Sequence, residues 1–379
     1  MKVLIVGGGV AGLAAARGLT AAGHDVEVYE GAPELRTEGG SVTLWPSSAG
    51  ILRELGVDLD GAGCRLETLE TWSVRGRRLG KIDMNVVERR FGGLHALHIA
   101  RRELVERLAE DVPVNYGHRI QAVDPDRAEI TFTDGNTARG DLLIGADGRN
   151  SVVRRALWGE SPAKLNGWVT WQAFTTLPTE FIDTGRSVMI SNGRALGSMA
   201  PAGHGKALWW FDLRAKPGSP LWVDAPNAMD LLRQRFGHWP EPFPTVLAQA
   251  QTAQCFPHYG HRVPAVWGRG PTTLVGDAAH TMSPAMAMGS GQALEDAWTL
   301  SRSADDPRAY ERARTKIVRR VAKMAGREIP SRQGPLMGLL PDSFSTKSSI
   351  SWLRSASGYL QEEAWLQRLP EAEPKKLPA

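Results

Sequence analysis

The first thirty residues constrain the fold of this chain more than any other segment. A short apolar stretch, Val3–Val6, has strand character and runs into a glycine turn, residues 7–12, with the sequence Gly-Gly-Gly-Val-Ala-Gly. A helix-like stretch from Leu13 to Ala22 follows, and a second, alternating strand ends at Glu30. The turn matches G-x-G-x-x-G and the acid lies about 20 residues beyond it, an order typical of a dinucleotide-binding unit.

Each part of this unit has a chemical role. Glycines let the backbone turn tightly and approach a pyrophosphate, and the N-terminus of the following helix offers free N–H groups and a partial positive charge. The acid can accept hydrogen bonds from a ribose. A lone G-x-G-x-x-G is also found in ordinary glycine turns, but the strand, helix and acid together favour dinucleotide binding. The candidate contacts are Gly7, Gly9, Val10, Ala11, Gly12 and Glu30.

Length and composition limit the class of protein. With 379 residues, 42% of them hydrophobic, the chain suffices for one large domain or two closely joined ones. Its net charge is +4, but basic and aromatic residues are not interleaved, so we expect no nucleic-acid partner. No stretch approaches the ~20 apolar residues of a membrane span. Cys64 and Cys255 are far apart and outside any metal-binding spacing. We therefore expect a soluble, cytoplasmic monomer or dimer without a metal, in a reducing compartment.

The order of strand and helix patterns predicts an α/β fold with an insertion. Alternation typical of strands occurs in residues 168–176, 187–191, 196–200 and 207–213. These segments indicate a mostly antiparallel sheet inserted into a doubly wound domain, and residues 67–84 suggest a hairpin that joins it. One predicted helix, 228–236, interrupts the run of strands. The predicted division gives 1–66, 97–165 and 265–327 to the dinucleotide-binding domain, 67–96 and 166–264 to the inserted domain, and 328–379 to a helical or irregular tail. Within this tail a short helix is predicted near 350–368.

Two further motifs lie at the ends of predicted strands. The apolar strand 142–144 stops at Gly145-Ala146-Asp147-Gly148, and a turn containing Arg and Ser then opens a helix. The strand 272–275 stops at Gly276-Asp277, and the loop beyond it passes Pro284 to a helix that begins near Gly289. In doubly wound folds, ligands bind at this carboxyl edge of the sheet. Asp277 is therefore a candidate for holding the polyol chain of a flavin, although acids also cap helices at such positions.

These three motifs, in this order, resemble the class A FAD-dependent monooxygenases of the para-hydroxybenzoate hydroxylase type, which include salicylate, urate and tetracycline hydroxylases. The resemblance covers roughly residues 1–325. It implies a Rossmann-like FAD-binding domain and an inserted sheet that roofs the substrate cavity. In addition to the turn residues and Glu30, it suggests FAD contacts at Arg36, Thr43, Arg101, Val123, Asp147, Asp277, Pro284 and Gly289. The chain departs from the family at Ala287-Met288, where Gly-Gln is usual, at Gly291, where Asn is usual, and at Ser47, which replaces the Asn of a Pro-Asn pair.

The resemblance also implies the reaction. NAD(P)H reduces FAD, O2 adds to give a flavin hydroperoxide, and its terminal oxygen is transferred to an electron-rich ring. No residue is assigned a catalytic role beyond the Pro284 loop beside the flavin, because the cofactor carries the chemistry. The chain has no second G-x-G-x-x-G for NAD(P)H, which suits a family in which the nicotinamide visits transiently. NADH and NADPH are not distinguished.

Candidate substrate contacts come from the inserted sheet. Arg194 is a candidate partner for a carboxylate or phenolate, and Gln172 and Trp210 are candidates for lining the cavity. Strand alternation turns only one of Trp209 and Trp210 inward, and the sequence does not say which. Surface or core roles are the alternatives for all of these residues. His258 and His280 are each open to two interpretations, a proton shuttle or a structural hydrogen-bonded histidine.

The leading functional hypothesis is hydroxylation of a small planar, electron-rich aromatic or heteroaromatic compound. The alternatives are a flavin-dependent epoxidase or dehydrogenase acting on a non-aromatic substrate, and a flavoprotein that sequesters a ligand without turnover. A flavin-dependent halogenase is disfavoured because its Trp-x-Trp-x-Ile-Pro motif is absent. In the tail, the apolar stretch 336–340 is predicted to cover part of the active-site mouth.

Overall fold

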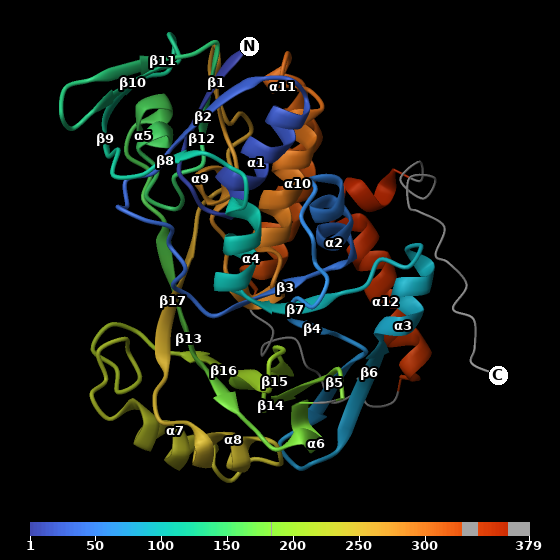
Figure 1. Cartoon of the computed structure of the whole chain (residues 1–379). Helices are drawn as coiled ribbons and strands as arrows, with labels where there is room; N and C mark the ends of the chain where they lie inside the picture. Colours follow the sequence, from blue (N-terminus) through green and yellow to red (C-terminus); the bar gives the residue numbers. More distant parts are fainter. Residues whose placement is uncertain (183, 328–339, 363–379) are drawn as a thin grey trace.

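The computed structural model describes residues 1–182, 184–327 and 340–362. Two large sheets lie one above the other, with the nucleotide-binding part at the top of Figure 1 and the inserted sheet at the bottom. The chain passes between the two parts several times, because strands of the lower sheet come from both early and late segments. This arrangement agrees with the predicted α/β fold with an inserted sheet.

The upper sheet is parallel and has the strand order β18-β12-β1-β2-β8. Its central strands are buried on both faces, which explains why β1 and β12 read as continuous apolar runs. The strands are β1 (Lys2–Val6), β2 (Asp25–Tyr29), β8 (Val114–Asn115), β12 (Leu142–Gly145) and β18 (Thr272–Leu274). Helix α1 (Val10–Ala21) packs against α10 (Gly289–Ser301) and α4 (Arg101–Ala109), and α11 (Pro307–Ala325) packs against α10.

Two small antiparallel sheets flank this part. The order β3-β7-β4 joins β3 (Ser41–Leu44), β7 (Leu97–Ala100) and β4 (Cys64–Arg65), and β11-β10-β9 joins β11 (Thr137–Arg139), β10 (Glu129–Phe132) and β9 (Ile120–Asp124). The shorter helices are α2 (Pro46–Glu54), α3 (Met84–Arg90), α5 (Val152–Trp158), α9 (Asp277–His280) and the 3-10 turns η1 (Pro284–Met286) and η4 (Tyr359–Gln361).

The lower sheet has the strand order β17-β13-β16-β15-β14-β5-β6. Its neighbours are antiparallel except β14 and β5, which are parallel. The predicted hairpin forms β5 (Thr68–Ser73) and β6 (Arg78–Asp83), and the predicted inserted strands form β13 (Lys164–Thr176), β14 (Arg186–Ser191), β15 (Ala195–Pro201) and β16 (Lys206–Arg214). The last strand is β17 (Gln254–Gly260).

One face of the lower sheet is covered by helices and the other faces the nucleotide-binding part (Figure 1). The covered face packs on α7 (Ala228–Phe236) and α8 (Phe243–Gln249), with Phe211 stacked on Phe236 at 4.2 Å between ring centroids. Helix α7 has the predicted bounds, whereas α8 and the short α6 (Thr179–Ile182) were not predicted. Prolines around residue 243 are typical of turns, so the local sequence gives little signal for α8.

Near the end of the described chain, α12 (Asp342–Ser355) packs against β6 and α3. It begins earlier than the short helix predicted near 350–368. The predicted cover of the active-site mouth, residues 336–340, lies outside the described residues except for Leu340, and so does the chain from residue 363.

Candidate active site

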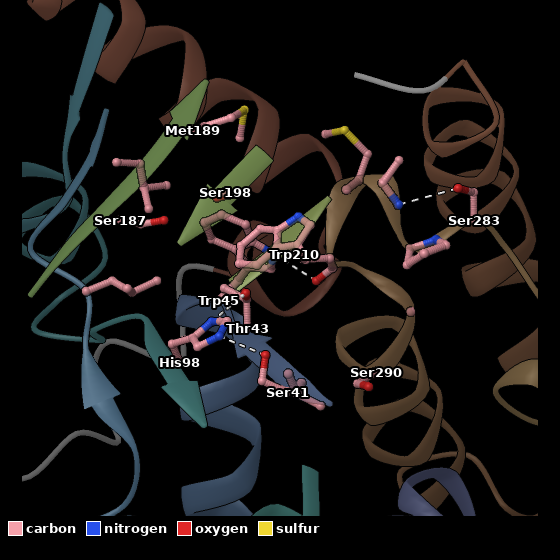
Figure 2. Close-up of a pocket in the computed structure, with 18 of the residues that line it drawn as sticks. Ser41, Thr43, Trp45, His98, Ser187, Met189, Ser198, Trp210, Ser283 and Ser290 are labelled. Carbon is pink, nitrogen blue, oxygen red and sulfur yellow. Dashed lines mark hydrogen bonds between the residues drawn. The ribbon is translucent and has the colours of Figure 1, made fainter. Parts of the chain in front are cut away.

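A cavity of about 820 Å³ lies between the two parts of the molecule. Its lower boundary in the fold is the inner face of the β13–β16 sheet, and its upper boundary is formed by the glycine turn, β3, β7 and the loop before α10. Figure 2 shows Trp210 between strands that carry Ser187, Met189 and Ser198 and the pair that carries Thr43 and His98. Helix α12 also lines this cavity, so its walls come from nearly the whole length of the chain.

The glycine turn is built as the sequence predicts. Gly7 has φ +112°, and a Cβ there would lie 2.4 Å from the Ala146 carbonyl oxygen. A Cβ on Gly12 would lie 1.9 Å from the Gly7 oxygen, so this glycine permits the close approach of helix and turn. At Gly9 there is nothing within 4 Å of a Cβ, because this residue opens to the cavity. Gly9 is also the N-cap of α1 and has no side chain to satisfy the first N–H groups, which suits an anionic ligand.

Glu30 is held rigidly at the end of β2. Its two carboxylate oxygens accept hydrogen bonds from the Gly8 N–H at 2.9 Å and the Ala32 N–H at 2.8 Å. The exposed Arg36 guanidinium lies 3.6 Å from the same carboxylate. Both residues lie outside the cavity lining, as does Val123, which is partly buried on β9. Glu30, Arg36 and Val123 therefore lie outside the cavity. The FAD contacts predicted for them stay predictions.

Asp147 has a structural role that accounts for one of its oxygens. Oδ2 accepts hydrogen bonds from the Val152 N–H at 2.6 Å and the Val153 N–H at 3.4 Å, at the start of α5. Burial raises the pKa of Asp147, while the hydrogen bonds to its carboxylate act in the opposite direction. The neighbours Ala146 and Gly148 line the cavity and Asp147 does not. A cap that shapes the turn is the role that these contacts support.

Asp277 and Arg101 both face the cavity. Asp277 is the first residue of α9, in the turn that follows β18, and it lines the cavity. Its enclosed position raises the pKa of the carboxyl, and His280 and nearby arginines oppose this rise. The Arg101 guanidinium donates to the backbone oxygens of Arg36 at 3.1 Å and Glu38 at 2.8 Å, which fixes the loop before β3.

A buried charge cluster supports the Asp277 turn from behind. The Asp296 carboxylate accepts hydrogen bonds from the Gly276 N–H at 2.9 Å and the Arg314 Nε at 2.8 Å, and it contacts His280 Nε2 at 2.5 Å. Burial alone would raise the pKa of Asp296, but His280 and Arg314 hold it below its usual value. His280 is fully buried in this cluster, which favours the structural interpretation of that histidine over a proton shuttle.

The loop before α10 carries one of the departures from the family pattern, Ala287-Met288. Pro284 and Gly289 line the cavity, and Gly289 begins α10 without a side-chain cap. Ala287 has φ +49°, the left-handed conformation that a glycine adopts more easily. Its carbonyl oxygen accepts a hydrogen bond from Trp45 Nε1 at 3.1 Å, which holds the loop in place. The alanine thus keeps the backbone conformation that the usual glycine would favour.

Of the three predicted substrate residues, two lie on the inner face of the lower sheet and line the cavity, and the third does not. Gln172 on β13 is paired with Trp210 on β16, and both line the cavity. Trp209 points to the opposite face, where it is fully buried, so Trp210 is the inward tryptophan. Arg194 does not fit the prediction. It lies exposed on the turn between β14 and β15, outside the cavity lining, because the strand ends before it and the chain reverses at Asn192-Gly193.

His98 is a cavity residue that the sequence did not single out. It lies on β7, with Nε2 2.7 Å from Ser41 Oγ and Nδ1 3.3 Å from Thr43 Oγ1. Its ring is nearly parallel to that of Trp210, with 6.1 Å between centroids. Burial lowers the pKa of His98 to about 4, so the ring is neutral at physiological pH. A histidine in a short apolar strand carries no local signal of this position.

A second missed feature is a buried polar chain that starts at Asp212. Thr170 Oγ1 donates to Asp212 Oδ1 at 2.5 Å and lies 2.7 Å from His258 Nε2. His258 Nδ1 lies 3.1 Å from Ser283 Oγ, on the loop before η1. Asp212, Thr170 and Ser283 line the cavity, and His258 is buried behind them. The signal in the sequence was an aspartate in the otherwise apolar strand 207–213.

Comparison with known proteins agrees with this geometry. The family model described as "FAD binding domain" matches residues 1–303. The Aurachin C monooxygenase/isomerase of Stigmatella aurantiaca is 30% identical over 310 residues, 80% of this chain and 80% of that relative. The chain belongs to the class A FAD-dependent monooxygenases. This membership confirms the resemblance found in the sequence, and with it FAD as the cofactor and NAD(P)H and O2 as co-substrates.

Other members of this monooxygenase family match over similar lengths. A 3-amino-4-hydroxybenzoate 2-monooxygenase of Streptomyces platensis is 29% identical over 93% of this chain and 95% of its own length. Among solved structures, Klebsiella pneumoniae HpxO complexed with FAD and uric acid gives a TM-score of 0.85 at 23% identity, covering 94% of this chain and 97% of that chain. The second comparison establishes the shared fold.

The described parts of the chain contain neither a helix that could span a membrane nor a cluster of side chains that could hold a metal ion. None of the helices in residues 1–182, 184–327 and 340–362 is long and apolar enough to cross a membrane. Within the same ranges, no group of three or more His, Cys, Asp or Glu side chains is arranged to hold a metal ion.

Proposed function

We propose that this protein hydroxylates a small planar, electron-rich aromatic or heteroaromatic compound, using FAD, NAD(P)H and O2. The observation that carries the proposal is the single cavity lined on one side by the glycine turn and the Asp277 loop and on the other by Trp210 and its polar neighbours. A flavin held by the first set of residues would place its ring next to the second. Names of relatives, such as the aminohydroxybenzoate monooxygenase and a urate hydroxylase of Klebsiella oxytoca, point to the same substrate class.

The residues on the nucleotide side fit FAD. The open Gly9 and the uncapped start of α1 suit a pyrophosphate, and the cavity-facing carboxylate of Asp277 suits the hydroxyls of a ribityl chain. The uncapped start of α10 at Gly289 places partial positive charge where the flavin ring would lie. When bound, FAD would supply the redox chemistry that brings electrons from NAD(P)H to O2. The predicted contacts of Thr43, Arg101 and Pro284 belong to this proposal, because all three line the same wall.

The protein's own contribution is to position the substrate and exclude water. Trp210 offers an aromatic face, and Gln172 beside it offers an amide that can donate or accept a hydrogen bond. Met189 and Leu196 add apolar surface from the neighbouring strands. A planar ring would thus be held between the sheet and the nucleotide-binding part, with a few polar groups to set its orientation.

The test is a substrate screen with the FAD-loaded protein. We expect flavin absorbance to bleach on anaerobic addition of NADH or NADPH, and to bleach faster when a suitable hydroxy- or amino-substituted ring is present. In air, labelled oxygen from ¹⁸O2 should appear in the product, with one product formed per NAD(P)H consumed. A protein that binds FAD and aromatic ligands but never consumes NAD(P)H faster in their presence would be a ligand-sequestering flavoprotein, and the proposal would be wrong.

A further inference from the structure

The cavity extends far beyond the tryptophan that faces it. Its floor is the inner face of the lower sheet, where direct pairing between strands gives the order of the side chains. From β13 to β6, one row of paired residues that line the cavity runs through Gln172, Trp210, Ser198, Met189, Thr71 and Gly80. This row crosses five strand spacings, or about 24 Å. A single aromatic ring is narrower than two such spacings, so a ring against Trp210 leaves most of the floor uncovered.

The two ends of this floor lie under different roofs. Above Trp210 the cavity is bounded by the nucleotide-binding part, because the His98 ring lies 6.1 Å from the indole between centroids and contacts Thr43. Above Gly80 it is bounded by α12, because a Cβ on Gly80 would lie 3.4 Å from Ser345 Oγ. The end under α12 therefore lies apart from the wall that fits the flavin. We call the part of the cavity from β14 to β6 the distal arm.

Helix α12 is held over the outer strand by two polar contacts. The Arg78 guanidinium pairs with the Asp342 carboxylate at 2.9 Å, and the Asp83 N–H donates to Thr346 Oγ1 at 3.1 Å. The residues of α12 that line the cavity recur every three to four positions, so they share one face of the helix. They are Phe344, Ser345, Ser348, Ser349, Trp352 and Leu353. The distal arm thus has a sheet as its floor and one helix face as its roof.

The described side chains that face the distal arm are uncharged. Glu70 and Lys81 border the same cavity, but they alternate with the floor residues and pair with each other, so their side chains project to the opposite face of the sheet. There the Glu70 carboxylate accepts hydrogen bonds from Arg186 Nε at 3.0 Å and Trp72 Nε1 at 2.9 Å. The floor of the arm consists of Ser187, Met189, Leu69, Thr71, Gly80 and Ile82.

Apolar groups line the distal arm along its length. Met189 lies at its inner end, and Leu69 and Ile82 are paired on β5 and β6. Between them, the Ser187 hydroxyl donates to a backbone oxygen of β15 at 3.3 Å. Phe344 lines the same cavity and is 53% exposed, so the apolar lining continues to the surface of the molecule. A ligand gains free energy wherever it removes such surface from water.

From this arrangement we propose that the distal arm is a subsite for an extended, uncharged apolar substituent on the ring that is hydroxylated. The substrate is then an aromatic or heteroaromatic compound whose ring lies at Trp210 and whose chain crosses β14 and β5 beneath α12. A chain with a charged end is disfavoured, because no described side chain that faces the arm offers the opposite charge. This inference deepens the proposed function and rests on it for the position of the ring.

The experiment measures how the FAD-loaded protein binds phenols of increasing chain length. The probes 4-methylphenol, 4-butylphenol and 4-octylphenol differ only in the chain, and 4-(4-hydroxyphenyl)butanoate matches the second with a charged end. Dissociation constants are measured at pH 7 by calorimetry and by the change in the flavin spectrum. We expect the affinity to rise about fourfold for each methylene that enters the arm, and the butanoate to bind no more tightly than 4-methylphenol. Equal affinities for the alkylphenols, or a butanoate that binds as tightly as 4-butylphenol, would overturn the inference.

Two blocking variants locate this gain in the distal arm. Thr71→Phe places a phenyl group on the floor and Ser345→Phe places one under the roof, so each should leave 4-methylphenol binding unchanged and weaken 4-octylphenol binding about tenfold or more. The matched control is Lys81→Phe, which adds the same group on the opposite face of the sheet and should leave the whole series unchanged. A blocking variant that binds 4-methylphenol normally and keeps the full gain with chain length would refute the assignment, as would loss of the gain in the control.

The outcome is separable from that of the proposed function. Affinities need no turnover, so a protein that hydroxylates none of the probes still shows the dependence on chain length if the arm binds the chain. Conversely, hydroxylation of 4-methylphenol and 4-octylphenol with the same KM would support the monooxygenase and refute the subsite. Because a variant with damaged packing would weaken every probe alike, the ratio of affinities distinguishes a blocked arm from a general structural effect.

Discussion

Replacing Ala287 with glycine should stabilise the protein, although the substitution removes a methyl group. Ala287 has φ +49°, and the left-handed conformation costs a residue with a Cβ about 1–2 kcal/mol. Glycine removes this cost but gains unfolded-state freedom worth roughly 0.5–1 kcal/mol. The expected net gain is about 0.5–1 kcal/mol in the free energy of unfolding. For a chain of 379 residues, at roughly 2 cal/mol/K per residue, this gain raises Tm by about 1 °C.

A second substitution in the same loop serves as an internal control, because it should lower the free energy of unfolding. Ala285 lies in the 3-10 turn η1 and is 8% exposed, so Ala285→Gly loses backbone restriction and a buried methyl group. Its expected cost is about 1.5 kcal/mol, or a fall in Tm of about 2 °C. Thermal melts of both variants, followed by intrinsic tryptophan fluorescence without FAD, give the two signs directly. If Ala287→Gly also lowers Tm, the alanine is not strained and the argument from its backbone fails.

Three further predictions concern the site and its support. Asp296→Asn should lower the free energy of unfolding by about 3 kcal/mol in urea titrations, because it removes one of the two buried carboxylates, Asp296 and Glu295, that pair with the Arg314 guanidinium. Since the pKa of Asp296 is depressed, this difference should shrink as the pH falls through that pKa. Gly9→Ala should leave the Tm of the FAD-free protein unchanged but weaken FAD binding in a flavin titration, whereas Gly12→Ala should lower both, because its Cβ would meet the Gly7 oxygen at 1.9 Å. The pKa of His98 is about 4, below its value of 6.5 in the unfolded chain, so its contribution to stability is full above about pH 6.5 and is lost toward pH 4; His98→Gln should show a shallower loss over this range in the same urea titrations.

The elements governed by local sequence were predictable. The glycine turn, the strand before it and the helix after it are specified by contiguous residues, and α7 was predicted with its observed bounds. The inward position of Trp210 was not decidable, because alternation says that neighbours point to opposite faces but not which face meets the cavity. That choice depends on α7 and α8 covering one side of the sheet, which is a tertiary property.

The substrate side of the site illustrates a different limit. Arg194 was predicted as a substrate contact because of its charge. Its exposure to solvent is set by the turn between β14 and β15, which depends on the pairing of these two strands. Asp212 was overlooked because its significance appears only when β13 and β16 are in register and Thr170 lies opposite. His98 likewise gains its environment from β3, more than fifty residues earlier in the chain. Pairing across strands is decided by the whole fold, so chemistry assembled that way is hidden from local patterns.

The junction of β14 and β5 has a consequence for how the chain folds. These strands are parallel, with Thr68 opposite Arg186, so the hairpin β5–β6 emerges from the ribosome long before its neighbour in the sheet. Until β14 arrives, one edge of the hairpin has unpaired backbone groups, and an isolated two-stranded hairpin is marginally stable in water. Contacts of such long sequence separation slow folding. The hairpin is thus the segment for which we expect chaperone protection during synthesis to matter most.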